Sequence, residues 1–120
     1  MMTGGMTPHA LARRRRVLFT MLTTLGFRYP PGREPPVIVG IRQYLAGWPG
    51  VGRIVAGMAH QQYDLRLTRY GQSGWEAIFY PAGIGHSLTP MVGTGWASEP
   101  AAAVQRAAWE ALRRRETEGA

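Results

Sequence analysis

An alternation of apolar and polar residues in the middle of the chain most constrains the fold of these 120 residues. Between Tyr63 and Arg69, Leu65 and Leu67 alternate with charged side chains, which is the period of a half-buried strand. A glycine-rich stretch at 71–74 follows, and residues 75–80 read as a second strand. The sequence therefore predicts an antiparallel hairpin.

The pairing of this hairpin follows from which residues must share its buried face. Leu67 lies on the same face as Ala77 and Phe79 only if the numbers of paired residues add to an even value. A two-residue turn would instead pair Leu67 with Ile78. We predict a three-residue loop at 72–74, which pairs Leu67 with Phe79 and places a glycine where a left-handed conformation is needed. The outer face then has mixed charge: Asp64, Arg66, Thr68, Glu76, Ile78 and Tyr80.

Helical spacing flanks the hairpin on both sides. Thr7 and Pro8 are typical of a helix start and Gly26 of a helix end, so a basic amphipathic helix is expected between them. Shorter helices are expected over 37–46 and from 51 to about 61, a third strand over 91–97, and a final helix after Ser98. Residues 81–90 read as an irregular connection.

The predicted fold class is α+β. A three-stranded antiparallel sheet packs against helices in the order helix, strand, strand, strand, helix, and the basic helix precedes it. We divide the chain into a basic N-terminal helix with a proline-rich linker (1–36), an α+β domain (37–115) and a disordered tail (116–120). No apolar run approaches the roughly 18 residues of a membrane span.

Composition argues against most catalytic chemistry. The chain has no cysteine, and all 14 basic residues are arginine, which excludes a thiolate metal site, a cysteine nucleophile and a Schiff-base lysine. His60 with Asp64, and His86 with Ser87, are generic pairs without a surrounding motif, and the acids are dispersed. We therefore expect a non-enzymatic protein with no catalytic residue, no metal and no cofactor.

Charge is concentrated at the ends of the chain. The formal net charge is +7, of which residues 1–33 carry +6 without a single acid, residues 34–112 carry zero and residues 113–120 carry +1. Clustered arginines are the electrostatic feature of nucleic-acid binding. The candidate nucleic-acid-binding residues are Arg13, Arg14, Arg15, Arg16, Arg28, Arg113, Arg114 and Arg115.

Other interpretations of these arginines stay open. The N-terminal segment fits a phosphate-binding arm, an idle solvated helix end or an export signal, although 28–31 offer no small-residue cleavage site. Because Arg13 to Arg16 point to all sides of a helix, we expect its first half to project into solvent. The run at 113–115 also suits a helix C-terminus, where the macrodipole favours cations.

The predicted element order resembles the double-stranded RNA-binding domain. Gly93 to Ser98, followed by the alanine-rich stretch 101–112, looks like that family's entry into its last helix. The family grips phosphates with lysines at the start of this helix, where the present chain has Glu99, Pro100 and Ala101, so the resemblance implies topology and not RNA binding. HicB-type antitoxins show a similar sheet and helix. Small uncharacterised bacterial proteins share the patterns at 57–58, 63–68 and 105–112.

Two functions follow as expectations. The first is a small binding or regulatory protein of a bacterial cytoplasm that contacts nucleic acid through its arginine-rich N-terminal segment. The alternative is a protein–protein interaction module, such as an antitoxin or an inhibitor, that uses the neutral outer face of its sheet.

Overall fold

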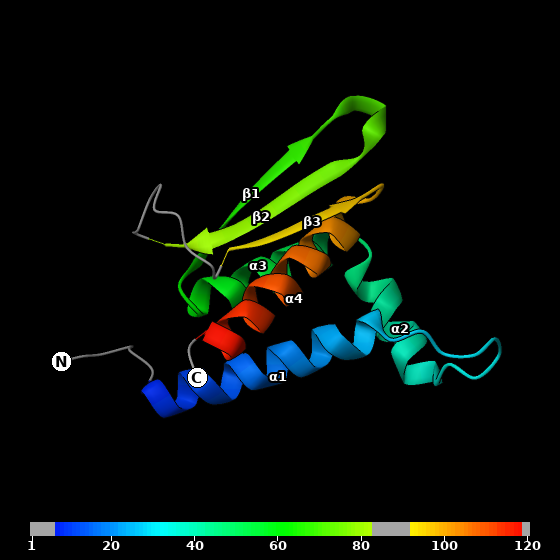
Figure 1. Cartoon of the computed structure of the whole chain (residues 1–120). Coiled ribbons are helices and arrows are strands. Elements are labelled where there is room, and N and C mark those ends of the chain that lie inside the picture. Colours follow the sequence, from blue (N-terminus) through cyan, green and yellow to red (C-terminus); the bar gives the residue numbers. More distant parts are fainter. Residues whose placement is uncertain (1–6, 83–91, 119–120) are drawn as a thin grey trace.

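The computed structural model describes residues 7–82 and 92–118 and has an α+β architecture of two layers with a further helix outside them (Figure 1). In chain order the elements are α1 (Pro8–Gly26), α2 (Pro36–Leu45), α3 (Trp48–His60), β1 (Tyr63–Arg69), the 3₁₀ turn η1 (Gly71–Ser73), β2 (Trp75–Pro81), β3 (Gly93–Ala97) and α4 (Pro100–Glu118). The strands form one antiparallel sheet in the order β1-β2-β3. The predicted fold class and the N-terminal helix are confirmed.

The hairpin register differs from the prediction by two positions. Leu65 pairs with Phe79 and Leu67 pairs with Ala77, so the expected pairing of Leu67 with Phe79 is wrong. The loop does contain three residues, but they are 71–73 instead of 72–74, and the Tyr70 N–H closes it by donating to the Gly74 carbonyl at 2.8 Å. A loop shifted by one residue moves the register by two, which is why the buried face is unchanged.

The sheet and α4 approach each other very closely. Gly93 and Gly95 of β3 face α4, and a Cβ built on them would lie 2.2 Å from the Ala107 carbonyl oxygen and 2.4 Å from the Ala103 carbonyl oxygen respectively. Glycine on the strand and alanine on the helix leave no room for larger side chains. This contact fixes where α4 runs beneath the sheet.

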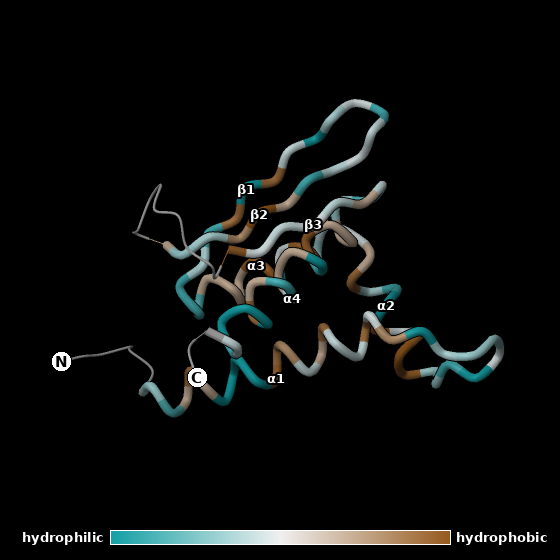
Figure 2. Tube along the Cα trace, in the orientation of Figure 1, coloured by the Kyte–Doolittle hydropathy of each residue, from teal (hydrophilic) through white to brown (hydrophobic). Residues whose placement is uncertain are grey.

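One hydrophobic core joins all the layers. Ile54 and Met58 of α3, Phe79 of β2 and Leu112 of α4 are buried together, and Leu22 of α1 belongs to the same cluster. Hydrophobic residues accordingly recur along α3, α4 and the strands (Figure 2). The N-terminal helix is therefore packed into the same core as residues 37–115.

The C-terminal helix is longer than expected, and parts of two expected segments lie outside the described residues. α4 continues to Glu118, so the part of the expected disordered tail at 116–118 is helical, while 119–120 lie outside the described residues. Most of the expected connection at 81–90, and Met91 at the start of the expected third strand, also lie outside them. None of the described helices is long and apolar enough to cross a membrane.

Candidate nucleic-acid interface

The two arginine runs meet at one end of the molecule, although almost a hundred residues separate them in the sequence. The beginning of α1 and the end of α4 lie side by side there (Figure 1). Arg15 Nη1 donates to Gln61 Oε1 at 3.2 Å, and Arg115 Nη1 donates to the Gln61 backbone oxygen at 3.4 Å. A single glutamine thus contacts one arginine from each run.

Gln61 holds this junction together because it is buried and contacts three helices, α1, α3 and α4. It caps the C-terminus of α3, is only 3% exposed, and its Nε2 donates to the Leu11 carbonyl of α1 at 3.0 Å. Arg15 is half-buried against it, so the first half of α1 does not project freely into solvent as expected. Sequence reasoning missed Gln61, since its partners are a distant carbonyl and two distant guanidinium groups.

The remaining arginines of the α1 run face solvent. Arg13, Arg14 and Arg16 are exposed, and within the described part of the chain no acidic side chain forms an ion pair with them. The hydrophilic colouring of this end is visible in Figure 2. These three guanidinium groups are available to an anionic partner.

Among the described side chains, Glu110 forms ion pairs with two arginines of α4. Glu110 Oε2 accepts from Arg114 Nε at 2.8 Å and also from Arg113. The hydrogen bond from Arg114 lowers the pKa of the Glu110 carboxyl below its usual range, against the opposing effect of partial burial, and Arg113 adds to the lowering. Glu110 therefore stays ionised at neutral pH and offsets part of the charge of this run.

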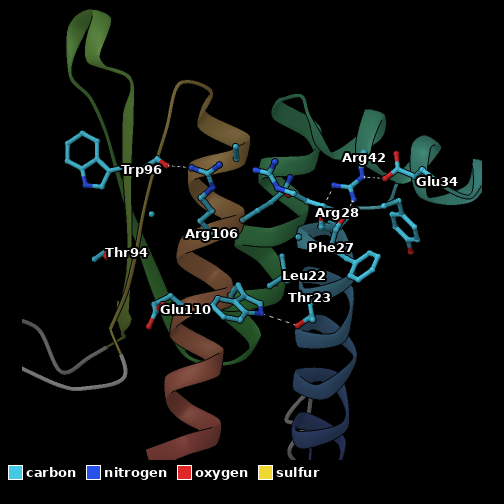
Figure 3. Close-up of a pocket in the computed structure, with 17 residues that line it drawn as sticks. Leu22, Thr23, Phe27, Arg28, Glu34, Arg42, Thr94, Trp96, Arg106 and Glu110 are labelled. Carbon is cyan, nitrogen blue, oxygen red and sulfur yellow. Dashed lines mark hydrogen bonds and ion pairs between the residues drawn. The ribbon is translucent and has the colours of Figure 1, made fainter. Parts of the chain in front are cut away.

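Arg28 lies apart from the other candidates, beyond the opposite end of α1. Gly26 lies ten positions after Arg16 in the helix, a distance of about 15 Å along the axis. Arg28 instead lines an open groove of about 1180 Å³ between the end of α1, the segment that follows it, β3 and α4 (Figure 3). The structure thus groups seven of the eight candidate arginines and separates the eighth.

One wall of this groove is fixed by Arg42 of α2. Its guanidinium group donates to Glu34 Oε2 at 2.7 Å, to the Phe27 carbonyl at 2.8 Å and to the Leu25 carbonyl (Figure 3). The opposite wall carries Arg106 of α4, whose Nη1 donates to the Trp96 carbonyl at 2.5 Å. Both arginines lie in the part of the sequence that carries zero net charge, residues 34–112. No local pattern in the sequence indicates that they donate hydrogen bonds to backbone carbonyls elsewhere in the chain.

Other candidate groups do not gather into a site. His60 and Asp64 are exposed, and no hydrogen bond joins them among the contacts of the described residues; His86 and Ser87 lie outside those residues. Nowhere in 7–82 or 92–118 do three or more His, Asp or Glu side chains form a group suited to a metal ion. The tryptophans are also spread out: Trp48 contacts Trp75, Trp96 contacts Tyr70, and Trp109 contacts Phe19.

No family model, no curated protein and no solved structure matches this chain.

Proposed function

We propose that this protein is a small non-enzymatic nucleic-acid-binding protein. Its contact region is the arginine surface, which we define as the exposed Arg13, Arg14 and Arg16 of α1 together with the exposed Arg113 and Arg114 of α4. The observation that carries the proposal is the meeting of the two arginine runs at Gln61, which brings the basic segments of both chain ends to one end of the fold.

The proposed mechanism is electrostatic. Exposed guanidinium groups pair with phosphate oxygens, often through two parallel hydrogen bonds, and release the counterions condensed on the nucleic acid. Residues 1–33 contain no acid that would repel the phosphates. Phosphate contacts of this kind position a protein on nucleic acid without reading its sequence. We therefore propose binding that is salt-dependent and tolerant of sequence.

A triple variant tests the arginine surface. Arg13→Gln, Arg14→Gln and Arg16→Gln together remove three exposed cations and leave Arg15, which contacts Gln61, in place. For duplex DNA, the slope of log K against log salt should fall by roughly two to three, at up to about 0.9 per lost phosphate contact. Fluorescence anisotropy over a salt series measures this slope.

Arg66→Gln provides the matched control. Arg66 is an exposed arginine on the outer face of the sheet, so its replacement should leave the slope unchanged. A slope that falls in Arg66→Gln and stays the same in the triple variant would place the contact on the sheet and contradict the proposal.

One observation favours a protein partner as the second candidate. Trp96 is 49% exposed on the sheet face opposite α4 and lies 5.1 Å from Tyr70, measured between ring centroids. Exposed Trp and Tyr are typical centres of protein–protein contacts. A pull-down with the full chain distinguishes the candidates: a partner retained after nuclease treatment and lost in Trp96→Ala supports this second function, and loss after nuclease alone supports the first.

A further inference from the structure

The charges that line the groove do not balance. Two acids line it, and both are already paired: Glu34 with Arg42, and Glu110 with Arg113 and Arg114. Arg28 and Arg106, which also line it, form no ion pair with any acid in the described part of the chain. The residues that line the groove thus carry a net charge of +1, and two of its three arginines have no ion-pair partner among the described residues.

These two charges lie on opposite walls. Arg28 belongs to the segment that follows α1 and Arg106 to α4; both line the groove, and the guanidinium group of Arg106 is turned toward the Trp96 carbonyl of β3 (Figure 3). Arg106 donates one of its N–H groups to the Trp96 carbonyl, and a guanidinium group has five such donors. An anion between the walls would receive hydrogen bonds from both sides, as a phosphate group does in charge-assisted pairs.

Aromatic rings flank Arg28. Phe27 and Tyr29 form an edge-to-face pair with ring centroids 4.7 Å apart, and Phe27 is 56% exposed. The floor of the groove beside them includes Leu22 and Leu25, which are buried and apolar. Aromatic side chains next to cations are the arrangement with which proteins stack unpaired bases and hold the adjoining backbone.

The aromatic wall is held in place before any ligand arrives. Arg42 ties the carbonyls of Leu25 and Phe27 to Glu34, so the segment between α1 and α2 is attached at both of its ends. A wall that is already ordered loses little conformational entropy on binding. Arg42 is thus a positioning residue for the groove and not itself a ligand contact.

We propose that the groove binds unpaired nucleotides of a single-stranded nucleic acid. A phosphate lies between Arg28 and Arg106, and a base packs on the Phe27–Tyr29 pair. The inference rests on the proposed function and adds its substrate class. A base inside a duplex presents only its edges, so its flat face cannot reach these rings, whereas the arginine surface contacts the backbone of either form.

Binding of a labelled oligo(dT) strand and of a duplex of equal length to the full chain tests this proposal. Arg28→Gln with Arg106→Gln should lower the single-strand salt slope by roughly 0.7, the value for the one phosphate that the two arginines share, and leave duplex binding almost unchanged. Phe27→Ala should weaken single-strand binding by about 5- to 150-fold, the range for one lost base stack. Because Phe27 is mostly exposed, this change should not alter the circular dichroism spectrum.

Arg33→Gln is the matched control, because Arg33 is an exposed arginine on the same segment that does not line the groove. The groove proposal is overturned if the double variant loses no more single-strand affinity than Arg33→Gln, or if it weakens duplex binding equally. Loss of duplex binding only in the variant of Arg13, Arg14 and Arg16 would then leave the proposed function standing alone. A wild-type chain that binds neither probe would overturn both.

Discussion

Gly95 shows how a single residue limits the packing of this fold. A Cβ at this position would lie 2.4 Å from the Ala103 carbonyl oxygen and 2.7 Å from the Ala107 backbone nitrogen, both part of the α4 backbone. Because a helix backbone cannot rotate aside as a side chain can, Gly95→Ala should push α4 away from β3. We expect a loss of at least about 2 kcal/mol in the free energy of unfolding, measured by urea denaturation.

Gly52→Ala is the control for this substitution. Gly52 is exposed within α3, and a Cβ added there meets no heavy atom within 4 Å. The replacement should stabilise the protein by about 0.4–1 kcal/mol, since it restricts the unfolded chain and favours helix. Equal effects of the two substitutions would contradict the close contact between β3 and α4.

At the same scale, the sequence shows where charge is concentrated more readily than it shows which residues form hydrogen bonds with each other. An arginine run is visible in the sequence because its members are adjacent. Gln61 and Arg42, which hold the candidate interface and the groove wall together, contact carbonyls 50 and 17 residues away, and no local pattern marks such contacts. The charged residues of the candidate site could thus be predicted from the sequence, whereas the residues that position them could not.

At the scale of elements, two residues that the sequence predicts on the same buried face, Leu67 and Phe79, differ in how deeply they are buried. Phe79 is completely buried, whereas Leu67 on the same face is only half-buried. Phe79→Ala should therefore cost about 3–5 kcal/mol in the free energy of unfolding, and Leu67→Ala clearly less. Arg66→Ala, on the opposite face, should stay within about 0.5 kcal/mol. Equal losses for all three in thermal or urea unfolding would show that the assigned face is wrong.

The hairpin also shows why the elements were more predictable than their alignment. The two-residue period fixes which face each strand buries, and the structure keeps that face. The loop position depends on which glycine takes a positive φ, and the turn uses both Gly71 (φ +55°) and Gly74 (φ +111°). Because the turn contains two glycines, loops at 71–73 and at 72–74 both bury the same face of each strand. The local spacing of residues does not distinguish between these two loops.

At the scale of the whole molecule, folding brings the positively charged arginine runs of α1 and α4 together. In the unfolded chain the two arginine runs are far apart, and folding places both beside Gln61. Glu110 offsets part of the α4 run, but Arg13, Arg14 and Arg16 form no ion pair with any acid in 7–82 or 92–118. Folding thus increases the local repulsion at the surface that we propose binds phosphates.

This repulsion predicts an unusual response to salt. Raising chloride from about 10 mM to about 100 mM shortens the screening length from about 30 Å to about 10 Å, which should weaken the repulsion in the folded state. We expect the free energy of unfolding of the wild-type chain to rise by about 1 kcal/mol, or roughly 3–6 °C in Tm. Chloride is the appropriate salt, because sulfate stabilises folded proteins by exclusion from their surface. The variant Arg13→Gln, Arg14→Gln and Arg16→Gln should begin with a higher Tm at low salt and gain much less from added chloride. A wild-type Tm that stays constant or falls over this range would show that the two arginine runs do not repel each other in the folded protein.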